Sequence, residues 1–101
     1  MKYEDIQTVQ RVCEQLTHFG ELLKRESSRE VVDEALESLQ KSRRDLKRVK
    51  SIPHIKLLRD SVSKCVKALE AFKAEKPEKA IQYANDAVIH ARLFETRCRK
   101  L

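Results

Sequence analysis

The chain has 101 residues and a formal net charge of +6; 38% of its residues are charged, 41% hydrophobic and 5% aromatic. This length allows one core, so we expect residues 1–101 to form a single helical-bundle domain. One Gly and two Pro leave little material for β-turns or Gly-rich loops, and hydrophobic residues at helical spacing argue against a disordered chain.

The first predicted helix runs from about Tyr3 to Arg25. Its hydrophobic residues recur three and four positions apart, which is the spacing of one face of an α-helix. Val12 and Phe19 widen this stripe, as a helix facing a bundle core requires. The stripe consists of Ile6, Val9, Cys13, Leu16, Gly20 and Leu23.

The second predicted helix follows a break at residues 27–30. Ser27 is expected to cap it, with Glu30 reaching back as the second half of a capping box. The helix continues to about Lys50, with acidic residues near its start and basic residues near its end, which suits the helix dipole. Its apolar stripe consists of Val32, Ala35, Leu39, Ser42, Leu46 and Val49.

The second break falls at Ile52 and Pro53, because proline fits a first helical turn and restricts the residue before it. A kinked continuation of the second helix is the alternative, but the stripe changes phase between Val49 and Ile55, which favours a true turn. The third predicted helix has Pro53 in its first turn and ends at residues 73–76. Its stripe consists of Ile55, Leu58, Val62, Cys65, Leu69 and Phe72.

Pro77 opens the fourth predicted helix. Ile81 and Val88 lie beside its apolar stripe, which is rich in alanine. The stripe consists of Ala80, Ala84, Ala87, Ala91, Phe94, Cys98 and Leu101. Four helices of similar length joined by short links predict an all-α, antiparallel up-down-up-down four-helix bundle. Association into a larger helical assembly is the alternative, because the same stripes would support it.

One layer of this bundle is expected to contain only small residues. The middle positions of the four helices are Cys13, Ser42, Cys65 and Ala91. Small residues in one layer indicate either close approach of the helices or a small internal cavity. We expect nothing polar enough to orient a ligand in such a cavity.

The sequence contains no motif for catalysis, a metal or a cofactor. A di-iron bundle needs buried carboxylates and Glu-x-x-His pairs, and zinc sites use closely spaced Cys and His, neither of which occurs. A phosphate-cradling loop needs more than one glycine. We therefore predict a non-enzymatic protein with no catalytic residue, no metal and no cofactor.

The expected location is cytoplasmic. No apolar run approaches the roughly 18 residues that a membrane span requires, and the N-terminus lacks the apolar stretch of a signal peptide. The three cysteines, Cys13, Cys65 and Cys98, are odd in number and scattered, which fits reduced thiols packed as small residues.

Basic residues cluster in the middle of the chain. Residues 40–64 contain nine basic and two acidic residues, a net +7 that exceeds the +6 of the whole chain. In the predicted topology the end of the second helix, the start of the third and the end of the fourth meet at one pole, and the opposite pole is mixed or acidic. The candidate site residues are Lys41, Arg43, Arg44, Lys47, Arg48, Lys50, Lys56, Arg59, Arg97 and Arg99.

A basic pole attracts nucleic-acid phosphates, anionic lipid heads or acidic protein surfaces. The leading hypothesis is contact with a nucleic-acid backbone, as a small subunit of a nucleoprotein complex, without base reading because aromatic residues are lacking. The alternative is a protein–protein adaptor or inhibitor that docks on an acidic partner surface. A solvated face without a specific role is the competing interpretation of the basic cluster. Among the functions, an enzyme ranks third and membrane-surface binding fourth.

Three leucines fall away from their own stripes and are expected to be exposed: Leu22, Leu57 and Leu93. Single exposed leucines are ordinary, but together they would extend a contact with another protein or with further copies of this chain. Homo-oligomerisation and membership of a larger complex both remain open.

Residues 68–87 carry a pattern of small residues in ALEAF, PEKAIQYA and Ala87. This hairpin is similar to one repeat of the tetratricopeptide class, or to the helical hairpin of microtubule-interacting-and-trafficking domains. The resemblance would imply binding of a peptide or helix in a groove. The pattern does not recur in the first half of the chain, and a solenoid needs about three repeats, so no family is assigned.

Overall fold

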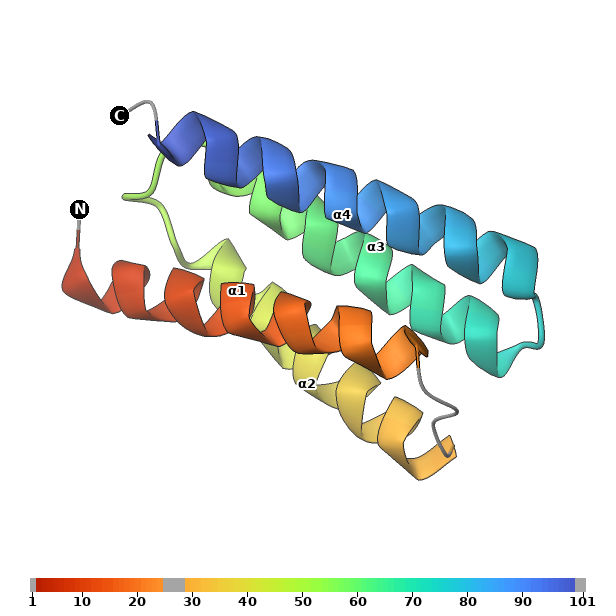
Figure 1. Ribbon diagram of the computed structural model, residues 1–101. Coiled ribbons are helices and arrows are strands. Elements are labelled where there is room, and N and C mark those ends of the chain that lie inside the picture. Colours follow the sequence, from red (N-terminus) through yellow and green to blue (C-terminus); the bar gives the residue numbers. More distant parts are fainter. Residues whose placement is uncertain (1, 25–28, 100–101) are drawn as a thin grey trace.

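The computed structural model describes residues 2–24 and 29–99, with the side chains of residues 2–19 and 29–98. It consists of four helices: α1 (Tyr3–Lys24), α2 (Arg29–Lys47), α3 (Ile55–Lys73) and α4 (Pro77–Arg99) (Figure 1). The described residues contain no β-strand. The predicted all-α helical bundle is confirmed. The predicted capping box at Ser27 lies outside the described residues.

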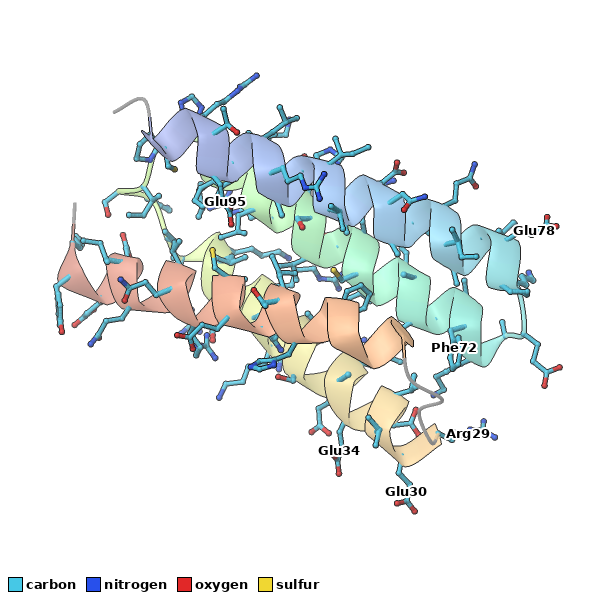
Figure 2. The ribbon with its side chains drawn as sticks, in the orientation of Figure 1. Arg29, Glu30, Glu34, Phe72, Glu78 and Glu95 are labelled. Atoms are coloured by element: carbon cyan, nitrogen blue, oxygen red, sulfur yellow. The ribbon has the colours of Figure 1, made fainter. Side chains whose placement is uncertain are left out.

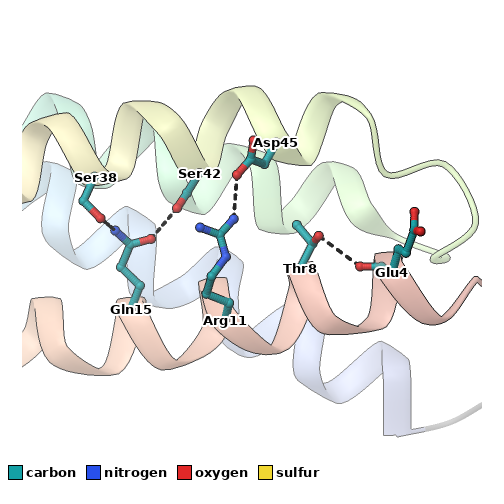
Figure 3. Close-up of polar contacts among 7 residues, drawn as sticks. All are labelled: Glu4, Thr8, Arg11, Gln15, Ser38, Ser42 and Asp45. Atoms are coloured by element: carbon teal, nitrogen blue, oxygen red, sulfur yellow. Dashed lines mark hydrogen bonds and ion pairs between the residues drawn. The ribbon is translucent and has the colours of Figure 1, made fainter.

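Contacts between α1 and α2 run in antiparallel order. The Asp5 carboxylate, near the start of α1, accepts a hydrogen bond from the Ser51 hydroxyl beyond the end of α2, at 2.6 Å. Further along α1, Arg11 Nη2 lies 2.6 Å from Asp45 Oδ2. Gln15 then contacts residues still earlier in α2 (Figure 3). These polar contacts cross a seam that is less extensive than the contacts of α3 with α2 and α4.

The later helix pairs are also antiparallel. Lys73, at the end of α3, forms an ion pair with Asp33 near the start of α2. The Ser61 hydroxyl donates a hydrogen bond to the Ala87 carbonyl oxygen at 2.7 Å, which joins the first half of α3 to the middle of α4. Figure 1 shows that successive helices run in opposite directions between the two ends of the molecule.

Helix α3 is the centre of the core, since it packs against both α2 and α4. Small residues such as Ala68 and Ala87 are buried where α3 meets α4, and this pair makes the most extensive contact. Burial of large aliphatic side chains is the main stabilising term of such a fold. The largest fully buried aliphatic side chains are Val12, Val32, Leu39, Leu46, Val49, Leu58, Val62 and Leu69.

Two expected boundaries near the second break were wrong. Helix α2 ends at Lys47 rather than Lys50, because the amides of Arg48 and Val49 bond three residues back and tighten the last turn. Pro53 is not in the first turn of α3, which begins at Ile55 after His54 in a left-handed conformation (φ 60°). The break itself is a true turn, as expected.

The connection between α3 and α4 is a helix C-cap followed by proline. The Lys76 amide donates to the Ala71 carbonyl and the Glu75 amide to the Phe72 carbonyl, which is the hydrogen-bond pattern of a Schellman motif. Glu75 has φ 59°, where glycine is usual. Pro77 then begins α4, as the sequence predicted.

Candidate anion-binding surface

The end of α2, the start of α3 and the end of α4 lie at the same end of the bundle (Figure 1). Three chain segments therefore bring basic side chains together there. We call this end the basic pole and define it by five exposed side chains: Lys47, Arg48, Lys50, Lys56 and Arg97.

Within the described side chains, no ion pair neutralises the charges of the basic pole. Among the side chains that the structure describes, none of these five forms an ion pair. Basic side chains along the length of the bundle do: Arg11 with Asp45, and Lys64 with Asp86 at 3.8 Å. Asp45 is the acidic residue between Gln40 and Lys50. Because it pairs with Arg11, its charge does not offset the basic pole.

Arg59 has a different role from the other candidate residues. Its Nε donates to the Leu46 carbonyl at 3.0 Å, and its Nη2 donates to the carbonyls of Val49 at 2.9 Å and Lys47 at 3.5 Å. These are carbonyl groups at the C-terminal end of α2 and just beyond it, where helix carbonyls lack partners and the dipole favours a cation. Arg59 thus caps α2, and its guanidinium is largely occupied.

The loop that carries Lys50 is tied to the start of α1. The Asp5 carboxylate accepts hydrogen bonds from both the hydroxyl and the amide of Ser51, at 2.6 and 3.3 Å, and the Lys2 amide donates to the Ser51 hydroxyl at 3.1 Å. The Ser51 hydroxyl bond is the main reason why the pKa of Asp5 lies below its usual value. Sequence reasoning missed this anchor because 46 residues separate its partners.

The N-terminal turn of α1 also brings an aromatic side chain to this end. Tyr3 is 71% exposed and begins α1 beside the loop that Asp5 and Ser51 hold. We expected no aromatic residue in the patch, and none of the five side chains that define the basic pole is aromatic; Tyr3 lies at the same end of the bundle. The antiparallel topology was the signal that could have found it, since the start of the first helix must share a pole with the end of the second.

Three further candidates lie on α2, with Arg44 in its last turn, and the side chain of a fourth is not described. Lys41 and Arg44 line a surface depression with Glu34, Glu37 and Ser38, so their surroundings are mixed in charge. Arg43 is partly buried. The side chain of Arg99 lies outside the described set. The structure thus brings together five of the ten candidates, together with Arg59 as a capping residue.

The opposite end of the molecule is mixed in charge, because exposed glutamates lie there beside Arg29, Lys73, Lys76 and Lys79. Glu30 and Glu34 from the start of α2, and Glu78 from the start of α4, are exposed there (Figure 2). We call the four exposed glutamates at this end the acidic pole: Glu30, Glu34, Glu75 and Glu78. The molecule extends 40 Å along its longest axis, so its two ends are separated by several Debye lengths at physiological salt.

A cleft of about 130 Å³ lies between α1, α3 and α4. Three of the four small residues predicted to share a layer line it: Cys13, Cys65 and Ala91. The fourth, Ser42, is buried at the α1–α2 seam, where its hydroxyl donates to Gln15 (Figure 3). The cleft therefore arises where small side chains leave the space between helices unfilled.

The rim of the cleft is polar, contrary to expectation. Arg92 and Glu95 of α4 lie on it, as does Thr17 of α1. Burial raises the pKa of Cys65 to about 12, and burial is also the main cause that raises the pKa of Cys13. Both thiols are thus held in the protonated form, which is a poor nucleophile.

The expected exposure of Leu57 was wrong, because this side chain is partly buried and packs against the core. Leu93 is 41% exposed, as expected, and the side chain of Leu22 lies outside the described set. Within residues 2–24 and 29–99, no helix is long and apolar enough to cross a membrane. No His, Cys, Asp or Glu cluster with the arrangement of a metal site occurs among the described residues either.

No protein-family model, no curated protein and no solved structure matches this chain. The resemblance of residues 68–87 to single helical repeats therefore remains a local packing pattern of small residues.

Proposed function

We propose that this chain is a non-enzymatic protein that binds nucleic-acid phosphate backbones through its basic pole, as a small subunit of a nucleoprotein complex. One observation carries the proposal. Five exposed basic side chains from three separate chain segments share one end of the bundle, and none forms an ion pair among the described side chains.

The chemistry of these side chains suits phosphate. Arg48 and Arg97 offer planar guanidinium groups for bidentate contacts, and the three lysines act as point charges. Contacts of this kind position a protein on a nucleic acid without reading its sequence. Tyr3 adds one exposed ring beside the pole, and stacking on an aromatic ring tolerates any base.

The test is binding of the protein to fluorescently labelled single- and double-stranded DNA and RNA, beside a globular control of equal size and net charge. Five phosphate contacts imply a loss of affinity of about 500-fold between about 50 and 200 mM salt. We expect tighter binding than the control and a loss of that order. Binding that does not change with salt would remove the electrostatic mechanism.

Binding no tighter than the control would also overturn the proposal. We would then propose that the basic pole binds an acidic surface of another protein. A pull-down with and without nuclease separates these two outcomes, because only a partner held through nucleic acid is lost after nuclease treatment.

A further inference from the structure

The cleft between α1, α3 and α4 has an apolar interior of the size of one aromatic ring. Leu16 and Phe19 of α1, Leu58 of α3 and Val88 of α4 line it, together with the small residues described above. Its volume is about 130 Å³. Engineered apolar cavities of about 150 Å³ bind benzene and stay dry without it. The cleft is therefore large enough for a single six-membered ring and too small for a larger ring system.

The hydroxyl groups on the wall of the cleft already have partners within the protein. The Ser61 hydroxyl donates to the Ala87 carbonyl oxygen at 2.7 Å, and the Thr17 hydroxyl donates to the Cys13 carbonyl oxygen at 3.1 Å. No buried side-chain nitrogen or oxygen among the described residues lacks a hydrogen-bond partner. A buried water needs two to four polar partners, so the interior of the cleft suits an apolar group better than it suits water.

Two thiols and one aromatic ring on the wall favour an aromatic occupant over a saturated one. Burial raises the pKa of Cys65 to about 12, and the pKa of Cys13 is raised by burial and by the negative charge of Glu95. Both sulfur atoms are therefore uncharged and polarisable, and such sulfur atoms make favourable contacts with aromatic rings. Phe19 adds a wall against which a second ring can pack edge to face.

The charges at the mouth of the cleft cancel. Arg92 and Glu95 are exposed on the rim and lie three residues apart on α4, so they are neighbours on the helix surface. A ligand with a net charge of either sign would meet one attractive and one repulsive group there, and it would lose hydration on entry. An uncharged ligand meets neither penalty, and a hydroxyl group on its ring would reach the Glu95 carboxylate as a hydrogen-bond acceptor.

We propose that this cleft is a binding site for a small, uncharged, single-ring aromatic molecule such as a phenol, with its ring between Leu16 and Phe19 of α1 and Leu58 of α3. Helix α1 packs less extensively than α3 and α4 do, so a bound ring would tie α1 to both of them. None of the five side chains of the basic pole lines the cleft. The site is thus independent of nucleic-acid binding, and either can fail without the other.

The first experiment is a titration of the isotopically labelled full chain with phenol, followed by NMR of the methyl groups. We expect saturable shifts at Leu16, Leu58 and Val88, and nuclear Overhauser effects from the phenol ring to these methyl groups. Benzoate should bind at least about tenfold more weakly because of its charge, and cyclohexanol about threefold more weakly because it lacks the aromatic contacts. Shifts that do not saturate, Overhauser effects that centre on Ile81 and Ile89, or equal binding of the three compounds would overturn the proposal.

A cleft-filling variant tests the same site independently. Ala91 is half-buried on the wall of the cleft, and Ala91→Leu should weaken phenol binding at least about tenfold, since one methylene in an apolar pocket already changes affinity by that factor. Ala74→Leu is the matched control, because it adds the same atoms at an exposed position outside the cleft, and its affinity should equal that of the wild type.

Thermal unfolding gives a second readout for these variants. Phenol at ten times its Kd should raise the Tm of the wild type and of Ala74→Leu by roughly 5 °C, and should leave the Tm of Ala91→Leu unchanged. Circular dichroism without phenol shows whether each variant is folded. Equal responses of the two variants would contradict binding in the cleft. If Ala91→Leu does not fold, the Overhauser effects in the wild type decide the question alone.

Discussion

Charge reversal at the basic pole is expected to lower nucleic-acid affinity by about 100-fold at low salt. In the variant Arg48→Glu plus Lys50→Glu, two phosphate contacts are lost and two carboxylates repel the backbone. The slope of log affinity against log salt should also fall by about two, since each phosphate contact contributes close to one. Fluorescence anisotropy with a labelled duplex, in a salt series, measures both quantities.

A matched control separates the pole from net charge. Lys76→Glu plus Lys79→Glu makes the same change in charge at exposed positions beside the acidic pole. The Debye length at physiological salt is about 8 Å, and the molecule is 40 Å long. The control should therefore lose no more than about threefold in affinity at that salt. Equal losses in the two variants would mean that overall charge, rather than the basic pole, sets the binding.

Arg59→Met is expected to lower the free energy of unfolding by about 1–3 kcal/mol, although this residue was predicted as a binding residue. Its guanidinium donates to the carbonyls of Leu46 and Val49 at 3.0 and 2.9 Å. Hydrogen bonds from charged groups contribute about 1.5–3 kcal/mol, and partial exposure of Arg59 reduces this. Urea denaturation followed by circular dichroism gives the free energy.

Lys56→Met is the control for the same experiment. Lys56 is exposed near the start of the same helix and makes no ion pair with any described side chain, so its loss should change stability by less than about 0.5 kcal/mol. Lys56→Met should instead weaken nucleic-acid binding. If both variants lost equal stability, the capping role of Arg59 would be wrong.

The helices could be predicted because periodicity is a local property of the sequence. Leu39 and Leu46 on α2, and Leu58 and Leu69 on α3, recur at helical spacing and are fully buried. The start of α4 at Pro77 followed from the fixed φ of proline. The end of α2 could not be placed in this way, because the groups that cap it belong to Arg59, thirteen residues beyond Leu46.

The position of the basic pole could also be predicted, since it needed only the charge pattern and the antiparallel topology. Which of these charges remain available to bind a partner could not be predicted. The pairing of Arg11 with Asp45 and the capping by Arg59 depend on side-chain positions across helix seams. Lys41 and Arg44 were grouped with the pole by sequence proximity, yet they share their surface with Glu34 and Glu37.

The exposure of Ile81 and Val88 on α4 was missed for a related reason. Ile81 and Val88 lie within a helical step of the alanine stripe, and their helical positions alone would let them extend the core. Whether such flanking residues are covered depends on how closely the neighbouring helices approach and where they lie around α4. Ala80 and Ala87 are small enough for α3 to approach closely, and the flanks remain in solvent.

The most direct test of the proposed nucleic-acid contact is amide chemical-shift mapping of the isotopically labelled protein with a short duplex at low salt. We expect the largest amide shifts at residues 47–56 and 92–98 and at the start of α1, with little change at residues 30–37 and 74–79. Shifts that centre on the acidic pole or on the outer surface of α2, or that spread evenly over the chain, would contradict a phosphate-binding basic pole.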